Sequence, residues 1–202
     1  MNMMLIHGQG RTPLAMVILG WRLRPYRVSY FGYACFAQSL ERTVARFVET
    51  IRQKMAGKPY LIVGHSLGGI IARASLPYLT DLPPRHLVML APPNQPPRLA
   101  KQMRAKLFYR LLTGDCGQKL ADNGFYECLP LPTIPTTIIA GTRGFHGSSS
   151  PFGDEPNDMV LSVSETRLGV NANLILLPVS HPFIMNSPEA ARIILEIAEA
   201  GS

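Results

Sequence analysis

The stretch LIVGHSLGGIIARASL, residues 61–76, places a serine between glycines. The pattern GHSLG at 64–68 follows an apolar run typical of a strand and precedes a run typical of a helix. A sharp strand-to-helix turn strains the backbone of its serine, and only small flanking residues leave room for it. The pattern predicts that Ser66 is held out as a nucleophile. A serine that merely caps a helix is the alternative, but a cap needs no glycine on both sides.

Nucleophilic attack by Ser66 requires a base, because a serine hydroxyl is a weak nucleophile until its proton is removed. His181 follows the last apolar run, 173–180, and precedes the last helical stretch. In a parallel sheet this loop would lie beside the Ser66 turn. The other histidines are less suitably placed, with His65 inside the turn, His86 at the start of a strand, His146 in a long loop and His7 in the loop after the first strand.

The histidine in turn needs a carboxylate that fixes its tautomer and stabilises the imidazolium. The expected chain order is serine, acid, histidine, and the acidic residues in that interval are Asp81, Asp115, Asp122, Glu127, Asp154, Glu155, Asp158 and Glu165. The acid is expected after the strand that precedes the strand leading to His181. This position leaves the last four of these residues as candidates. We favour Asp158 in PNDMVLSV, because the apolar run after it can anchor the loop. Asp154 is the second choice, and a solvated loop carboxylate is the alternative for both.

Acyl transfer also needs hydrogen-bond donors for the oxyanion, usually backbone N–H groups. The N–H of Leu67, at the start of the helix after Ser66, is one candidate. The loop His7-Gly8-Gln9-Gly10 after the first strand is expected to provide the second, from Gln9 or else Gly10. A glycine-rich loop before a helix can instead bind phosphate, but the G-x-G-x-x-G spacing and a P-loop lysine are absent.

Strands and helices alternate along the chain in the order that these residues require. Apolar and β-branched runs predict six strands, at 3–6, 27–33, 59–66, 86–91, 136–141 and 173–180. Helices are predicted after Thr12, from Ser39 to Gly57, from Ser66 to about Pro77, and from Ser187 onward. This alternation indicates an α/β fold with a mostly parallel six-stranded sheet flanked by helices. Loops beyond the carboxyl ends of such strands build the site.

Composition limits the class of protein. The 202 residues, 16% of them charged, are typical of one soluble domain. No apolar run is long enough to span a membrane, and no signal peptide is visible. We therefore expect a cytoplasmic protein. The net charge of +7 is unevenly distributed along the chain, because residues 1–114 hold sixteen Lys/Arg and only three Asp/Glu. No nucleic-acid-binding pattern accompanies this charge. We expect reduced thiols at Cys35, Cys116 and Cys128 rather than a Cys116–Cys128 disulfide.

Four segments together, LIHGQG, LIVGHSLGG, NDMVLSV and VSHPF, resemble the α/β-hydrolases, and in particular their compact bacterial lipase-like members. The resemblance covers nearly the whole chain. It implies a compact α/β-hydrolase fold and an esterase that works through an acyl-enzyme, with Ser66, Asp158 and His181 as triad and Gln9 and Leu67 as oxyanion donors. Two features depart from the pattern, since the acid lies well beyond its strand and no full-size cap domain is present.

The segment at about 92–135 is an insert between the fourth and fifth strands. Within it, residues 98–112 place Leu99, Met103, Leu107, Leu111 and Leu112 at helical spacing, with Arg98, Lys101, Arg104, Lys106 and Arg110 between them. This basic amphipathic pattern predicts either a helix packed on the sheet or a small lid beside Ser66. As a lid, it would offer a basic face to an anionic membrane.

The sequence therefore predicts a serine carboxylester hydrolase that acts on a small-molecule ester or lipid and uses no metal or organic cofactor. A thioesterase or an acyltransferase would use the same residues, since the choice of acceptor depends on pocket shape. A non-catalytic binding module on the same fold is the third hypothesis, although binding would not require all three triad residues.

Overall fold

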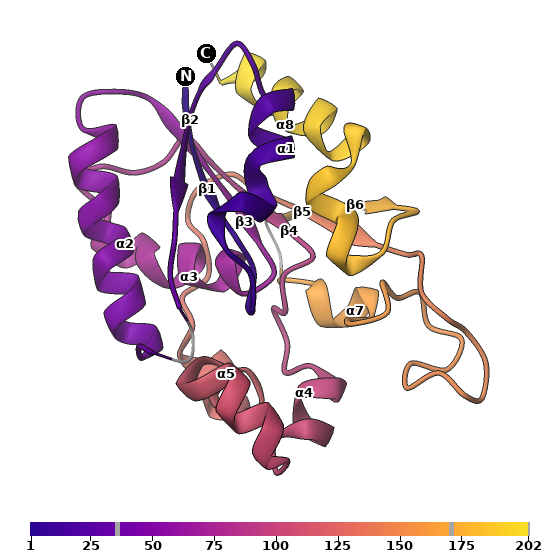
Figure 1. The fold of residues 1–202 in the computed structure, drawn as a ribbon. Helices are drawn as coiled ribbons and strands as arrows, with labels where there is room; N and C mark the ends of the chain where they lie inside the picture. Colours follow the sequence, from indigo (N-terminus) through magenta and orange to yellow (C-terminus); the bar gives the residue numbers. More distant parts are fainter. Residues whose placement is uncertain (35–36, 170–171, 202) are drawn as a thin grey trace.

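Six parallel strands form the sheet at the centre of the molecule (Figure 1). The structure, a computed structural model, describes residues 1–34, 37–169 and 172–201, and of residues 107–112 it describes the backbone alone. The strand order is β2-β1-β3-β4-β5-β6, and each neighbouring pair is parallel. The strands are β1 (Asn2–Ile6), β2 (Arg27–Phe31), β3 (Tyr60–His65), β4 (His86–Leu90), β5 (Thr136–Gly141) and β6 (Ala172–Leu177). The predicted fold class is confirmed.

Helices cover both faces of this sheet (Figure 1). On one face lie α2 (Leu40–Met55) and α3 (Leu67–Ser75), and on the other lie α1 (Val17–Arg22) and α8 (Pro188–Ala200). In the described part of the chain, short 3-10 helices adjoin these helices, η1 (Pro13–Met16) before α1, η2 (Leu76–Tyr78) after α3 and η3 (His181–Asn186) before α8. Both termini lie at the end of the molecule opposite to the insert (Figure 1).

The central strands are buried on both faces, which explains their continuous apolar sequences. Every residue of β3 and of β5 is buried. Successive side chains of β1 alternate, so that Met4 and Ile6 enter the core under α2 and α3 whereas Met3 and Leu5 enter the core under α1 and α8. The carboxyl ends of these buried strands are therefore firmly held.

The predicted elements are present with shifted ends. Ser39 caps α2 by accepting a hydrogen bond from the Arg42 N–H, and Ser187 caps α8 by accepting one from the Ala190 N–H. The helix predicted after Thr12 begins as the 3-10 turn η1 before it becomes α1. The last strand is shorter than predicted and ends at Leu177, so residues 178–180 belong to the loop that leads to His181.

The insert contains three helices, α4 (Arg98–Met103), α5 (Leu107–Leu120) and α6 (Asn123–Cys128). The prediction of one continuous helix over 98–112 is therefore wrong, because the backbone turns extended at Lys106 (φ −75°, ψ 125°). Of the predicted stripe, Leu99 and Met103 lie on α4. The side chains of Leu107, Arg110, Leu111 and Leu112 lie outside the described residues.

The segments before and after this break are attached to different parts of the molecule. The Arg98 N–H donates to Glu165 Oε1 (2.7 Å), and the Arg98 guanidinium pairs with Glu155 at 2.6 Å. In α5, the Asp115 carboxylate accepts a hydrogen bond from the N–H of Leu40 at the start of α2 (2.9 Å). Tertiary contacts of this kind override local helix propensity.

Two whole-chain expectations concern the cysteines and the membrane. Cys116 is buried and Cys128 is exposed, and the disfavoured disulfide between these two residues is absent. Cys35 lies outside the described residues. Within the described ranges, none of the helices combines the length and apolarity that a membrane crossing requires.

Candidate active site

Ser66 lies in a strained turn between β3 and α3, as the glycine pattern predicted. Its backbone has a positive φ (φ 52°, ψ −122°), a conformation that non-glycine residues adopt rarely. A Cβ at Gly64 would lie 2.5 Å from the Gly69 nitrogen, and a Cβ at Gly68 would lie 2.6 Å from the carbonyl oxygens of Ile6 and His7. Both glycines are needed because backbone packs directly against backbone here.

Three predicted residues come together at this turn. The Ser66 Oγ lies 3.1 Å from His181 Nε2, and His181 Nδ1 lies 2.7 Å from Asp158 Oδ2. Asp158 and His181 are buried, whereas Ser66 is partly exposed. The result is a hydrogen-bonded line that runs from a buried carboxylate, through an imidazole, to a hydroxyl at the surface.

The Asp158 carboxylate is fixed from two sides. Its Oδ1 accepts hydrogen bonds from the N–H groups of Leu161 (2.7 Å) and Val160 (3.0 Å), which leaves Oδ2 for His181. The backbone carbonyl of Asp158 accepts from the His181 N–H at 2.9 Å. Asp158 therefore binds His181 through both its side chain and its backbone, and the apolar run after it anchors the loop.

The other acidic candidates lie elsewhere. Asp154, the second choice, is exposed and does not take the place opposite His181. Glu155 pairs with Arg98 and accepts from the Ser164 N–H. Glu165 accepts from the N–H groups of Ser162 and Arg98 and closes the capping box of the short helix α7 (Val163–Thr166). Glu155 and Glu165 thus attach the insert to the loop that carries Asp158.

His65 was not singled out from the sequence, and the structure places it directly behind His181. The two rings lie with centroids 5.0 Å apart, and His65 Nε2 lies 3.1 Å from the His181 carbonyl oxygen, so Nε2–H is the donor. Burial, followed by the charges of His181 and Arg11, holds the pKa of His65 well below its ordinary value. A neutral His65 therefore supports the backbone of His181. Its position inside GHSLG was the only signal available.

The loop after β1 lies against the same turn. A Cβ at Gly8 would lie 2.7 Å from His65 Nδ1 and 3.1 Å from Ser66 Cβ, so only glycine fits there. The His7 ring stacks on Tyr33 with centroids 4.4 Å apart, and the Tyr33 hydroxyl donates to the His7 carbonyl at 2.9 Å. Burial lowers the pKa of His7. These contacts hold the backbone next to Gln9 beside Ser66.

The two predicted oxyanion donors belong to segments next to Ser66, Leu67 to the start of α3 and Gln9 to the loop after β1. Leu67 is the first residue of α3, and an N–H in a first helical turn has no acceptor within its helix. Gln9 is half-buried, and its side-chain amide reaches the Thr113 carbonyl in the insert at 3.5 Å. Gly10, the alternative donor, is exposed and has a positive φ of 67°.

Solved structures with the same fold include several hydrolases. The chain superposes on the mature lipase BlEst2 from Bacillus licheniformis with a TM-score of 0.74 at 16% identity, covering 97% of this chain and 91% of that one. The TM-score with phospholipase PlaB from Legionella pneumophila is 0.78 at 17% identity, and the match covers all of this chain but 59% of PlaB. The Vlm2 thioesterase domain matches with a TM-score of 0.59 at 18% identity, over 96% and 92% of the two chains.

Comparison by sequence gives the family. No curated protein matches the chain. The model of the α/β hydrolase family matches residues 3–147, a range that holds the His7–Gly10 loop and the Ser66 turn. Because this match covers more than half of the chain and the parallel sheet agrees with it, the chain belongs to the α/β hydrolase family.

Proposed function

We propose that this protein is a serine hydrolase that cleaves carboxylic esters through an acyl-enzyme on Ser66. The observation that carries the proposal is the line Ser66–His181–Asp158, with contacts of 3.1 and 2.7 Å, at a strained turn. This arrangement has the geometry of a nucleophile, a base and an orienting acid. Strain at Ser66 would not be retained for a simple helix cap.

In the first half of the reaction, His181 Nε2 takes the proton of Ser66 Oγ while Oγ bonds to the ester carbonyl carbon. The carbonyl oxygen becomes an oxyanion that accepts hydrogen bonds from the N–H groups of Leu67 and Gln9. The intermediate collapses when the bond to the alcohol oxygen breaks and His181 Nε2 returns its proton to that oxygen. The alcohol departs, and the acyl group stays on Ser66.

In the second half, a water molecule occupies the place of the alcohol. His181 Nε2 removes one proton from the water, and the oxygen bonds to the acyl carbon. The bond to Ser66 Oγ then breaks, and His181 gives its proton back to Oγ, so the enzyme is restored and a carboxylic acid leaves. Asp158 keeps the proton of His181 on Nδ1 throughout and stabilises the imidazolium.

Lipases and esterases among proteins of similar fold support this assignment, and a thioesterase domain of similar fold supports a second candidate. A thioester donor would form the same acyl-enzyme, with a thiol in place of the alcohol as the leaving group. Transfer to another acceptor in place of water would make the protein an acyltransferase. The site machinery is common to all three, and the pocket decides among them.

The test combines a covalent label with a substrate panel. A fluorophosphonate is expected to modify the wild type and the control variant Ser148→Ala, which changes an exposed loop serine, but not Ser66→Ala. p-Nitrophenyl esters of increasing chain length and acyl-CoA thioesters are then compared on the same three proteins. A folded wild type that reacts with neither the label nor any ester would refute the proposal, and faster acyl-CoA turnover would favour the thioesterase.

A further inference from the structure

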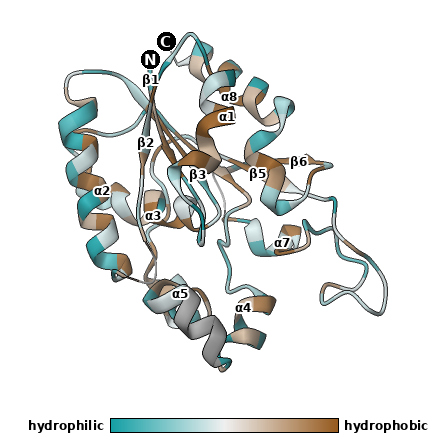
Figure 2. Ribbon diagram, in the orientation of Figure 1, coloured by the Kyte–Doolittle hydropathy of each residue, from teal (hydrophilic) through white to brown (hydrophobic). Residues whose placement is uncertain are grey.

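The helix that follows the His7–Gly10 loop is apolar on both of its sides. Met16, Leu19 and Leu23 are buried against the sheet. The opposite side carries Leu14 (79% exposed), Val17 (45%), Ile18 (47%) and Trp21 (62%), at steps of three, one and three residues along η1 and α1. Figure 2 shows brown where η1 passes into α1 and teal along much of α2. A helix that is apolar all round is normally covered on every side.

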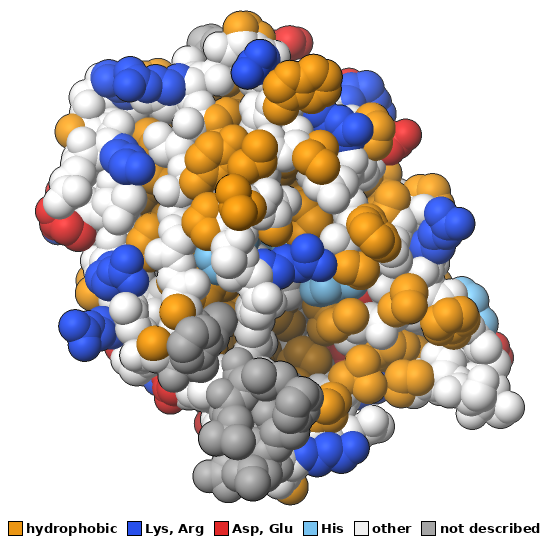
Figure 3. Space-filling model, viewed as in Figure 1, with side chains coloured by type: hydrophobic (Ala, Val, Ile, Leu, Met, Phe, Trp, Pro, Cys, Tyr) orange, Lys and Arg blue, Asp and Glu red, His pale blue; other side chains and the backbone are white. Residues whose placement is uncertain are grey.

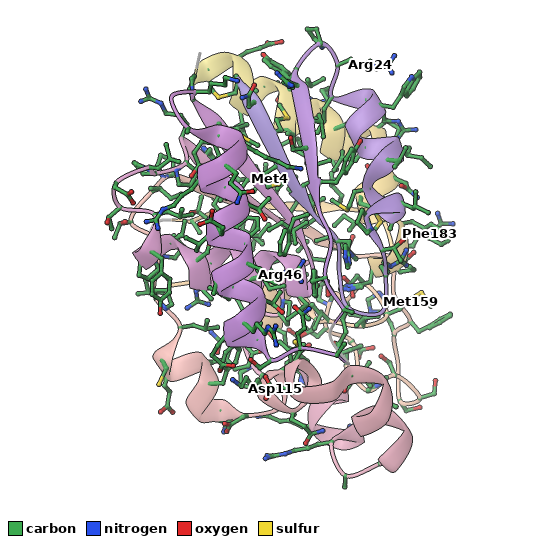
Figure 4. All side chains as sticks on the ribbon, turned by 60° about the vertical axis from the view of Figure 1, so that its left-hand side comes forward. Met4, Arg24, Arg46, Asp115, Met159 and Phe183 are labelled. Atoms are coloured by element: carbon green, nitrogen blue, oxygen red, sulfur yellow. The ribbon has the colours of Figure 1, made fainter. Side chains whose placement is uncertain are left out.

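This surface continues around the Ser66 site. Phe183 on η3 is 63% exposed, and η3 packs against η1 and α1, where Arg22 donates to the Asn186 carbonyl. Met159 and Val160, which follow Asp158, are 43% and 39% exposed. Figure 4 shows Met159 and Phe183 projecting outward on the same side of the molecule. We call Leu14, Val17, Ile18, Trp21, Met159, Val160 and Phe183 the apolar rim.

The apolar rim comes from the same segments that carry the candidate site. Leu14 lies four residues after Gly10, Phe183 lies two residues after His181, and Met159 directly follows Asp158. Figure 3 shows hydrophobic side chains gathered above and to the right of histidine side chains near the middle of this face. Part of the apolar rim therefore belongs to the segments that carry Asp158 and His181.

The N-terminal segment that carries Leu14, Val17, Ile18 and Trp21 has arginines and no acidic residues. Residues 1–40 contain no Asp or Glu, and Arg11, Arg22, Arg24 and Arg27 lie in this segment. Arg11, Arg24 and Arg27 form no ion pair with the described residues, and Glu189 is close enough to Arg22 for the arginine to lower the pKa of that carboxyl. Figure 4 shows Arg24 at the far end of α1. An apolar surface with a cationic border is complementary to anionic phospholipid.

We propose that the apolar rim docks on the surface of an anionic phospholipid bilayer and so presents Ser66 to that surface. Trp21 is suited to the interface between headgroups and acyl chains, because its ring is both apolar and polar. A second copy of this chain is the rival occupant. A two-fold dimer through the rim would set the arginine borders of both copies against each other. The bilayer covers the same apolar area and gains from the same charges.

The single tryptophan of the chain is Trp21, so its fluorescence reports on the apolar rim directly. The protein is titrated with vesicles of phosphatidylcholine containing 30 mol% phosphatidylglycerol, and separately with phosphatidylcholine alone. On the anionic vesicles, Trp21 emission is expected to shift to shorter wavelength and to be quenched by brominated acyl chains. Weaker binding at high salt is expected. Equal binding to both vesicle types, or an unchanged Trp21 spectrum, would overturn the proposal.

Paired variants localise the contact. Val17→Ser with Ile18→Ser is expected to lower vesicle partitioning at least about tenfold, because two exposed aliphatic side chains no longer enter the membrane. Arg24→Gln with Arg27→Gln is expected to lower it about fivefold per arginine. The matched control is Tyr78→Ser with Leu131→Ser, two comparably exposed side chains (60% and 61%) in η2 and after α6. Equal partitioning of the rim variant and this control would refute the rim assignment.

Two further measurements separate the alternatives. Sedimentation equilibrium without lipid is expected to show a monomer, and a dimer that dissociates in the Val17→Ser and Ile18→Ser variant would assign the rim to a second copy instead. Docking requires no turnover, so Ser66→Ala is expected to bind vesicles like the wild type. Vesicle binding without ester hydrolysis would refute the proposed function alone, and hydrolysis without vesicle binding would refute this proposal alone.

Discussion

The two sides of the candidate site are held by different means. On the serine side, residues 64–69 pack backbone against backbone on the end of β1, and the glycines leave no space for a side chain. On the acid side, Asp158 lies seventeen residues beyond the end of β5 and is held by hydrogen bonds from Val160 and Leu161 and by its contacts with His181. The serine side is held chiefly by close backbone packing, whereas the acid side adds a set of polar contacts to its packing against Gly141, where a Cβ would lie 2.8 Å from Asp158 Cβ.

This difference predicts different responses to mutation. A side chain added on the serine side would overlap with backbone atoms and force them apart, so such a variant should lose stability. A changed hydrogen bond on the acid side should lower activity more than stability, because a loop near the surface can keep its conformation when one hydrogen bond changes. Variants of the two sides should therefore separate stability from activity.

The largest effect is expected on activity at the acid side. Asp158→Asn keeps the oxygen that accepts from Val160 and Leu161 but sets an amide opposite His181 Nδ1, which favours the wrong tautomer. We expect kcat for ester hydrolysis to fall about 10⁴-fold with little change in melting temperature. The measurement is steady-state hydrolysis beside thermal unfolding. Asp154→Asn, an exposed neighbour, serves as control and should retain its kcat; a similar loss in both variants would show that the loop itself was damaged.

The next effect is expected on stability at the serine side. Gly68→Ala introduces a Cβ 2.6 Å from the carbonyl oxygens of Ile6 and His7. We expect the free energy of unfolding to decrease by at least about 3 kcal/mol, measured by urea denaturation. Gly169→Ala is the control, because a Cβ there meets nothing within 4 Å. A Gly68→Ala variant as stable as the control would mean that the backbone of the serine side can move to accept a side chain. The proposed difference between the two sides would then be wrong.

The same difference explains what the sequence could predict. The GHSLG pattern was sufficient to place the Ser66 turn, because the two glycines that the turn requires stand two residues away on either side of the serine. The alternation of strands and helices along the chain and helix caps such as Ser39 are also local signals, and these predictions are confirmed. Asp158 could be preferred over Asp154 only from the apolar run after it, because the loop's path depends on contacts with β6 and η3.

Long-range contacts produced the errors. The break at Lys106 was not foreseen, and the contacts on either side of it are made with Glu165 and Leu40, about sixty residues away in either direction along the chain. The role of His65 depends on the His181 carbonyl, more than a hundred residues later. Neither contact leaves a periodic signal in the sequence. The apolar side of α1 was likewise visible only after the buried side had been identified.

A smaller effect on stability is expected from pH, through His65, which belongs to the Ser66 turn and contacts His181. Burial, and then the charges of His181 and Arg11, lower the folded-state pKa of His65 well below the ordinary value of 6.5. The unfolded chain therefore binds a proton that the folded chain does not, and stability present above about pH 6.5 is lost as the pH falls below it. Each such proton costs up to about 1.4 kcal/mol per pH unit.

Urea denaturation from pH 7.5 to 5 measures this loss. His65→Gln, which retains a donor for the His181 carbonyl, is expected to flatten the decline, while His7, whose pKa is also lowered by burial, leaves part of it. The exposed His146→Gln serves as control and should follow the wild type. Parallel curves for His65→Gln and the wild type would show that His65 is not the proton-linked group.

The smallest effect is expected where the insert is tied to the acid side, at the pair of Arg98 with Glu155. A double-mutant cycle with Arg98→Met and Glu155→Gln should give a coupling of about 0.5–1 kcal/mol, because the partly exposed arginine is screened by solvent. The exposed pair Arg52–Asp81 is the matched control and should couple more weakly. A coupling above about 3 kcal/mol would mean that the insert and the Asp158 loop unfold as one unit, so the acid side would be as firmly built as the serine side.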